Sequence, residues 1–183
     1  MQNLIEINTE NFDVVLDLRY ATENNVCQRR LYSYPFCYLH KEAAEALQKA
    51  IEAASNIGLK IKIFDSFRPI EVQQYMFDQF PGGFVSNPKN GRIPHCRGVA
   101  VDLTLVDESG AELDMGTDFD EFSDLAHHNC SKVSVEAQRN RLILLGLMKL
   151  AGFDHLSFEW WHYQLPNPTS YEVVAAKDGM VGV

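Results

Sequence analysis

The sequence has little of several features that mark common protein classes. It contains 4 cysteines in 183 residues, scattered at Cys27, Cys37, Cys96 and Cys130 without a Cys-x-x-Cys pair, so it indicates neither a zinc ribbon nor a disulfide framework. No run approaches the ~20 apolar residues that a membrane helix needs. The segment from Met1 to Asp13 lacks the basic start and apolar stretch of a secretory signal. We therefore expect a cytoplasmic protein with reduced thiols and no membrane association.

Basic residues are also scarce. Lys and Arg number 16 against 25 Asp and Glu, which gives a formal net charge of -9. Such a surface repels phosphate backbones on average, so nucleic acid is not an expected partner. The sequence also lacks a Gly-rich phosphate loop after its first strand, which argues against a Rossmann-type fold.

Periodic apolar residues indicate the helices. Hydrophobic residues make up 46% of the chain, enough for one sizeable core, and we expect a single domain over residues 1–183. Spacings of three and four predict helices over 41–56, 70–80 and 135–151. Pro69 suits the first turn of the second helix, because no partner is needed there for its missing N–H.

Alternating apolar residues predict strands over 59–65 and 99–105, and a segment rich in aromatic residues predicts a final strand over 158–165. In the middle strand, Asp102 falls on the face opposite Val101 and Leu103. Helices and strands alternate and are joined by long irregular loops. This order predicts an α+β domain with a small, mainly antiparallel sheet flanked by helices.

Three residues form a candidate zinc site. A catalytic zinc ion needs three protein ligands and a fourth position open to water. Six residues separate His95 from Asp102 in the chain, and a turn at Gly98 can bring the two together; His162 is the third candidate. A lone histidine is usually an ordinary surface or core residue. Asp102 in an apolar strand and Glu159 beside two tryptophans are harder to dismiss, because a buried carboxylate without a partner is costly.

The spacing within the last strand adds a further expectation. Glu159 and His162 would face opposite ways on an ideal strand, so we expect a bend or bulge there. The adjacent His127 and His128 are further candidates in principle. Their side chains should diverge, and we favour a surface or loop location for both.

Two segments carry a family resemblance, and three shorter ones agree with it. The main segments are residues 95–105, HCRGVAVDLTL, and 159–163, EWWHY. The supporting segments are residues 16–22, LDLRYAT; 65–69, DSFRP; and 115–120, MGTDFD. In this order they resemble the zinc D-alanyl-D-alanine dipeptidases of the VanX type, and the resemblance covers most of the chain.

The resemblance implies a fold of the Hedgehog/DD-peptidase type and one Zn²⁺ per chain, held by His95, Asp102 and His162. Glu159 would act as the catalytic base, and Arg68 would stabilise the developing oxyanion.

The resemblance also assigns a substrate subsite. Asp120 would pair with the substrate ammonium and Tyr20 would line the pocket. Without the resemblance, these two residues and Arg68 would be interpreted as ordinary turn, strand and surface residues. The chain departs from the family pattern at Ile93 and Pro94, where small polar residues are usual.

The leading hypothesis is hydrolysis of free D-Ala-D-Ala, or a closely related D,D-dipeptide, by metal-activated water. One alternative is a D,D-carboxypeptidase or endopeptidase that acts on larger muropeptides. The other is a zinc-binding module without catalysis. The sequence leaves the oligomeric state open.

Overall fold

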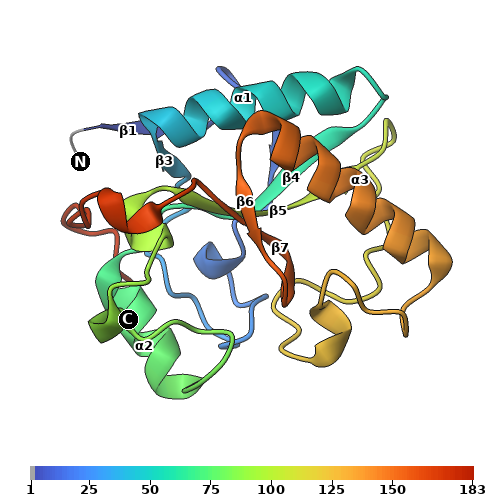
Figure 1. Cartoon of the computed structure of the whole chain (residues 1–183). Coiled ribbons are helices and arrows are strands. Elements are labelled where there is room, and N and C mark those ends of the chain that lie inside the picture. The colour runs from blue at the N-terminus through green and yellow to red at the C-terminus, as the bar shows by residue number, and fades with distance from the viewer. Residues whose placement is uncertain (1–2) are drawn as a thin grey trace.

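A five-stranded sheet forms the centre of the fold. The computed structural model describes residues 3–183 (Figure 1). The strands are β2 (Val14–Leu16), β4 (Lys60–Asp65), β5 (Ala100–Val106), β7 (Glu159–Gln164) and β6 (Asp154–Leu156), in that spatial order. Only β2 and β4 pair in parallel, and every other neighbouring pair is antiparallel. The expected mainly antiparallel sheet is therefore confirmed.

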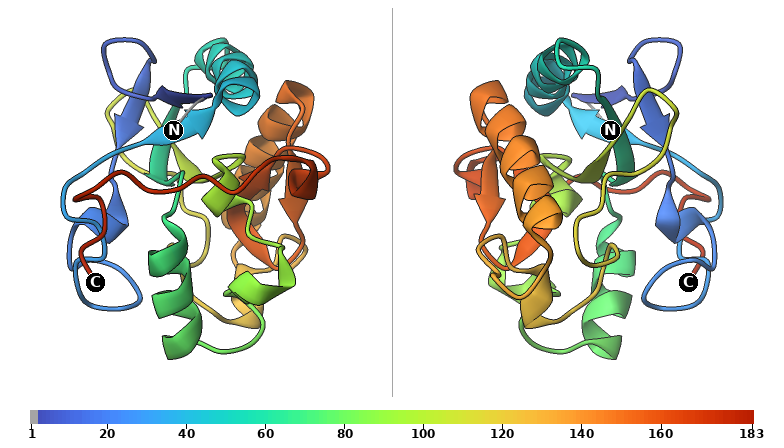
Figure 2. Two further views of the ribbon diagram at one scale, coloured as in Figure 1. Left: turned by 90° about the vertical axis from the view of Figure 1, so that its left-hand side faces the viewer. Right: turned by 90° about the vertical axis from the view of Figure 1, so that its right-hand side faces the viewer.

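Three α-helices flank this sheet within the described residues: α1 (Lys41–Ser55), α2 (Ile70–Gln79) and α3 (Val135–Ala151). The helices α1 and α3 lie side by side and cover one face, while α2 lies on the other side of the strands (Figures 1 and 2). A separate two-stranded sheet pairs β1 (Leu4–Glu6) with β3 (Tyr38–His40). The α+β architecture is confirmed.

The ends of the helices follow local sequence signals. At the start of α3, the Ser134 hydroxyl accepts a hydrogen bond from the Ala137 N–H at 2.9 Å. At its end, Gly152 adopts a left-handed conformation with φ of 104°, which costs glycine little. Pro69 stands immediately before α2 as its cap residue. It therefore lies one position earlier than the expected first turn.

The central strand β5 is buried along its whole length. Val101 and Leu103 belong to the hydrophobic core, but Asp102 and Thr104 on the other face are buried as well. The carboxylate of Asp102 therefore lies in a protein interior, where it needs charged or hydrogen-bonding partners.

Two irregularities in pairing position the side chains at one end of the sheet. Between β4 and β5 the register shifts, so that Asp65, and not Phe64, lies opposite Asp102. Between β6 and β7 the register also shifts: His155 pairs with Tyr163, whereas the next residue of β6 pairs with Glu159. The expected irregularity near Glu159 is confirmed.

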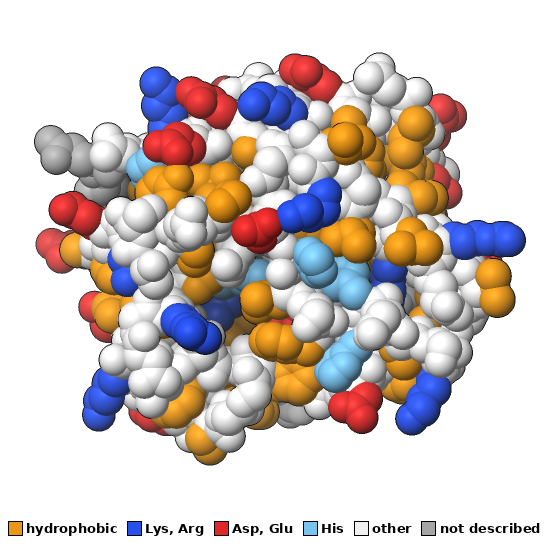
Figure 3. Space-filling model, viewed as in Figure 1, with side chains coloured by type: hydrophobic (Ala, Val, Ile, Leu, Met, Phe, Trp, Pro, Cys, Tyr) orange, Lys and Arg blue, Asp and Glu red, His pale blue; other side chains and the backbone are white. Residues whose placement is uncertain are grey.

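Several short elements had no expectation from the sequence: β1, β2, β3, β6 and five 3-10 helices, one of which, η3 (His95–Arg97), carries a candidate ligand. None of the helices in residues 3–183 has the length and apolar character needed to cross a membrane. Over the face shown in Figure 3, acidic and basic side chains are interspersed, and histidine side chains gather near its centre.

Candidate metal centre and active site

The sheet register brings two of the three expected zinc ligands together. Asp102 of β5 lies directly opposite His162 of β7. Residues directly opposite in an antiparallel pair project to the same face. Asp65 of β4 is the neighbour of Asp102 on its other side, so three polar side chains form a row across three strands.

His95 reaches this row from outside the sheet. It begins η3, and Gly98 follows with φ of 67°. A Cβ atom on Gly98 would lie 2.6 Å from the Leu4 side chain and 3.2 Å from the His40 nitrogen, so the turn fits tightly against the β1–β3 sheet. This turn returns the chain into β5 and places His95 over Asp102, as the sequence predicts.

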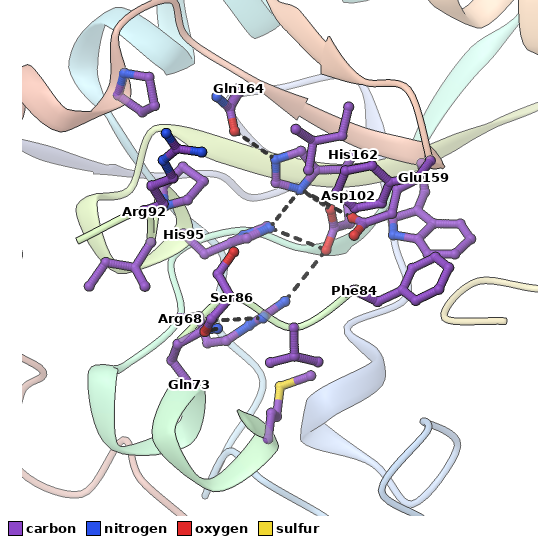
Figure 4. A pocket seen from close by; sticks show the side chains of 18 of the residues that line it. Arg68, Gln73, Phe84, Ser86, Arg92, His95, Asp102, Glu159, His162 and Gln164 are labelled. Carbon is purple, nitrogen blue, oxygen red and sulfur yellow. Dashed lines mark hydrogen bonds and ion pairs between the residues drawn. The ribbon is translucent and has the colours of Figure 1, made fainter. Parts of the chain in front are cut away.

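The donor atoms of the three side chains have a spacing that suits a metal ion (Figure 4). His95 Nε2 lies 3.1 Å from His162 Nδ1, His162 Nδ1 lies 3.0 Å from Asp102 Oδ1, and His95 Nε2 lies 3.4 Å from Asp102 Oδ2. A tetrahedron with metal–ligand distances of about 2 Å has edges of about 3.3 Å. Within residues 3–183, this is the one group of three or more such side chains whose ligand atoms converge. We refer to these three residues as the triad.

Hydrogen bonds leave bare nitrogen atoms on both histidines. His95 Nδ1 lies 2.7 Å from the Ser66 carbonyl oxygen, which can only accept, so Nδ1 carries the proton. His162 Nε2 lies 3.1 Å from Gln164 Oε1, and an N–H donated there leaves Nδ1 free. Two lone pairs and a carboxylate then face one another, which only a cation or a proton between them makes favourable. The triad therefore fits a divalent metal, with the outer hydrogen bonds that metal-bound histidines usually make.

Within the triad, Asp102 and the histidines stabilise each other's charged forms. Burial opposes ionisation of Asp102, but the neighbouring His95 and His162 hold the pKa of its carboxyl well below its usual range. Burial opposes charge on His162 in turn, while the hydrogen bond and negative charge of Asp102 raise the pKa of that imidazole. A positive charge is thus favoured among these three residues.

Glu159 lies beside the triad without belonging to it. Its Oε2 is 3.8 Å from His162 Nδ1, and the residue is 6% exposed. Burial, together with the negative charges of Asp102 and Asp120, raises the pKa of Glu159 to about 8. A buried carboxyl group whose pKa lies near neutrality can exchange protons with a reacting molecule.

Arg68 is fixed on the other side of Asp102. Its Nε and Nη2 atoms donate to Asp65 Oδ2 at 3.0 and 2.8 Å, and its Nη1 donates to Gln73 Oε1 at 3.0 Å. Its Nη2 also lies 3.6 Å from Asp102 Oδ2. The guanidinium is 5.0 Å from the centre of the Tyr20 ring. The structure therefore shows a buried and oriented cation, in contrast to the surface arginine that the residue alone would suggest.

Asp120 and Tyr20 form a second polar pair in the same cavity. The Tyr20 hydroxyl donates to Asp120 Oδ2 at 2.6 Å. Burial raises the pKa of Asp120 to about 7, helped by the negative charge of Asp102 and opposed by the Tyr20 hydrogen bond. The backbone of Asp120 has φ of 61°, a conformation that few residues other than glycine adopt.

One cavity of about 580 Å³ contains all these side chains. Aromatic residues form one of its walls, where the Phe84 ring stacks on Phe122 at 4.9 Å and meets Phe158 edge-on at 5.8 Å. This volume falls within the ~300–1,000 Å³ typical of small-molecule sites. Each of the seven expected site residues lies along this cavity: His95, Asp102, His162, Glu159, Arg68, Asp120 and Tyr20.

Three residues that hold the site side chains in position were not identified from the sequence. Asp65 holds Arg68, the Ser66 carbonyl orients His95, and Gln164 orients His162. A carboxylate that ends an apolar strand, three residues before an arginine, is a signal that could have identified Asp65. A backbone carbonyl and a glutamine carry no comparable signal. His127 and His128 lie outside the triad.

Comparisons with known proteins agree with this geometry. A family model described as D-ala-D-ala dipeptidase, peptidase family M15, matches residues 2–176. The chain belongs to this dipeptidase family. The D-alanyl-D-alanine dipeptidase of Escherichia coli K12 is 40% identical over 163 residues, which cover 89% of this chain and 84% of that protein.

More distant members agree. The D-alanyl-D-alanine dipeptidase of Enterococcus faecium is 30% identical over 183 residues, covering 85% of this chain and 89% of that protein. The protein of the same name from Streptomyces coelicolor is 28% identical with the same coverage. The resemblance in the sequence motifs is therefore confirmed at the level of the family.

Proposed function

We propose that the protein is a zinc-dependent dipeptidase that hydrolyses free D-Ala-D-Ala, or a closely related D,D-dipeptide, to its amino acids. The observation that carries the proposal is the convergence of two bare imidazole nitrogens and one carboxylate, with the unligated Glu159 beside them. The names of the relatives support the choice of substrate. One zinc ion per chain and a cytoplasmic location are parts of the same proposal.

In this proposal the triad holds the metal through His95 Nε2, Asp102 and His162 Nδ1. A bound zinc ion supplies a Lewis acid that acidifies water and polarises a carbonyl group. The triad would supply three protein ligands, whereas protein side chains usually fill all four positions of a structural zinc site.

Glu159 is proposed to move the proton. It removes a proton from the water that attacks the peptide carbonyl carbon, and it delivers that proton to the amine released when the C–N bond breaks. Burial raises the pKa of Glu159 to about 8, so its carboxyl group can hold the proton that it delivers to the amine. A cation held by the triad would favour the ionised form of Glu159 and so prepare it as a base.

Arg68 and Asp120 are proposed to recognise the charges of the substrate. Arg68 is preoriented by Asp65 and Gln73, so it can donate hydrogen bonds to the oxygen that becomes negative during the attack. Asp120, held by the Tyr20 hydroxyl, can pair with a free ammonium group, which the substrate presents only when its amino terminus is unblocked. That requirement favours a dipeptidase over an enzyme of larger muropeptides.

The substitution Glu159→Ala tests the catalytic assignment. Zinc content and fold should persist, while kcat for D-Ala-D-Ala should fall by about 10²–10⁴, because proton transfer by a positioned carboxylate contributes that much. Metal analysis and circular dichroism provide the controls. Hydrolysis at an unchanged rate would eliminate Glu159 as the base. Absence of hydrolysis by the zinc-loaded, unsubstituted protein would favour a zinc-binding module without catalysis.

A substrate panel tests the recognition of the amino terminus. D-Ala-D-Ala should be cleaved much faster than its N-acetylated form by the unsubstituted protein, and Asp120→Asn should reduce this preference. Equal cleavage of the blocked and free dipeptides would refute the assignment of Asp120 and favour the muropeptide alternative.

A further inference from the structure

Arg92 is the second arginine along the cavity, and its setting differs from that of Arg68. Both side chains line the cavity. Arg68 is buried and bound to Asp65 and Gln73. Arg92 is exposed, and no hydrogen bond or ion pair links its side chain to any residue between 3 and 183. The cavity therefore has one buried cation, Arg68, that is bound to other side chains, and one exposed cation, Arg92, that is not.

The backbone of Arg92 is held in place although its side chain is free. The preceding Gly91 adopts a left-handed conformation with φ of 70°, and its carbonyl accepts a hydrogen bond from Arg97 Nη2 at 3.1 Å. The following Ile93 is 3% exposed, and its carbonyl accepts from the Cys96 N–H at 3.1 Å. The side chain of Arg92 therefore extends from a backbone position that is held on both sides, three residues before His95.

A basic and an acidic side chain of the cavity lie on opposite sides of His95. Figure 4 shows Arg92 on the side of His95 away from Glu159. Acidic groups outside the triad are supplied by Asp120 and Glu159. The neighbours of Arg92 along the chain, Ile93 and Pro94, offer no charge to compete with it. A ligand that is positive at one end and negative at the other would match this arrangement.

A dipeptide with free termini is such a ligand. Two residues in extended conformation span about 7 Å, so a dipeptide in this cavity presents its ammonium group and its carboxylate to separate side chains. We propose that Arg92 binds the C-terminal carboxylate of the substrate and thereby fixes which peptides are accepted and in which direction they lie. This inference rests on the proposed dipeptidase function and extends it to a residue that determines specificity.

The chemistry of arginine supports this role. Its planar guanidinium group pairs with a carboxylate through two parallel hydrogen bonds. A cation at the carboxylate end and an acidic pair at the ammonium end also repel a peptide that enters in the reverse direction. Peptides that are amidated, or extended beyond the second residue, lack a carboxylate at this point and would bind less well.

The experiment measures binding separately from hydrolysis. In zinc-loaded Glu159→Ala protein, titration calorimetry gives the Kd of D-Ala-D-Ala and of its C-terminal amide, with and without Arg92→Ala. We expect Arg92→Ala to weaken binding of the free dipeptide about tenfold and that of the amide by less than about twofold. Arg92→Lys should retain part of the preference. Lys89→Ala, which removes a charge from the same loop outside the cavity, should leave both Kd values unchanged.

Either of two results with Arg92→Ala overturns the inference. Equal weakening of the dipeptide and its amide would indicate a structural role, and unchanged Kd values for both ligands would remove Arg92 from recognition. Hydrolysis by protein with Glu159 intact is assayed in parallel. Absence of hydrolysis together with an Arg92-dependent preference for the carboxylate would refute the dipeptidase proposal while leaving the Arg92 assignment in place. Failure of free D-Ala-D-Ala to bind would overturn both proposals.

Discussion

Two pairs of histidines lie near the strand β7, and only one of them is suited to bind a metal. The rings of His95 and His162 are 4.9 Å apart, and those of His128 and His155 are 5.1 Å apart. The first pair shares the carboxylate of Asp102. The second pair has no carboxylate within ion-pair distance, and His128 Nε2 is buried without a hydrogen-bond partner among the described residues.

The electrostatic consequences are opposite. Asp102 helps to raise the pKa of His162 despite burial. Burial, with the nearby His155 and Arg141, lowers the pKa of His128 to about 4. Proximity of two imidazoles is therefore not sufficient for a metal site. A shared anion and acceptors for the outer N–H groups are what turn neighbouring histidines into ligands.

The substitution Asp102→Ala should have the largest effect, because it makes the first pair resemble the second. We expect zinc affinity to fall by more than about 100-fold, since a ligand should matter more than the outer partners, whose loss costs about 10–100-fold. Hydrolysis should be lost with the metal. Competition with a zinc chelator measures the affinity. Retention of zinc at the original affinity would show that the two histidines suffice.

The substitution Asp65→Asn tests whether a nearby carboxylate other than Asp102 contributes to zinc binding. Asp65 Oδ2 lies 3.7 Å from His95 Nδ1, but that nitrogen faces away from the triad. We expect zinc to remain bound, while kcat falls about 10–100-fold because Arg68 loses its charged anchor. Stability should fall by about 3 kcal/mol, as when one partner of a buried ion pair is removed. Loss of zinc would instead assign Asp65 to the metal site.

Substitutions at Gln164 should change zinc affinity by a smaller factor, and the direction of the change should depend on the new residue. Gln164→Leu removes the acceptor for the His162 N–H and should weaken zinc binding about tenfold. Gln164→Glu places a carboxylate there, makes the imidazole a stronger donor to the metal, and should strengthen binding. Parallel zinc titrations of both variants provide the test. Changes in the same direction would contradict the proposed hydrogen-bond role.

The substitution His128→Gln should leave the metal site unchanged and alter only the pH dependence of stability. His128 has a pKa of about 4 when folded against 6.5 in its ordinary state. The unfolded chain therefore binds more protons in this range, and stability falls as the pH drops from 6.5 to 4, with no further loss below. We expect this loss to be about 2 kcal/mol smaller in the variant. Urea unfolding of the zinc-free proteins at pH 7 and pH 4 measures it, and an identical loss in both would show that His128 is not buried in neutral form.

The sequence predicts most of the elements that carry long periodic patterns. The helices α1 and α3 and the strand β5 lie within one or two residues of their expected bounds. The strands β1, β2, β3 and β6 have three residues each, too few for a period of two to stand out. Their formation depends on partners far away in the chain.

The candidate site was predictable in composition but not in its supporting contacts. His95, Asp102 and His162 could be identified because motifs mark them, and the turn at Gly98 explains how they meet. The orientation of each imidazole depends on Ser66 and Gln164, which act through a backbone carbonyl and an amide. Such contacts are fixed by strand register, which no local pattern specifies.

The register shift at Phe64 has a consequence for how this protein can change during evolution. Because side chains alternate along a strand, one residue inserted between Ile63 and Phe64 would exchange the two faces beyond Ile63. Phe64 would then lie opposite Asp102, and Arg68 would lose its anchor. Surface loops of the same chain can gain or lose residues at small cost. We therefore expect homologues to vary in length in their loops and to keep an invariant number of residues between Ile63 and Arg68.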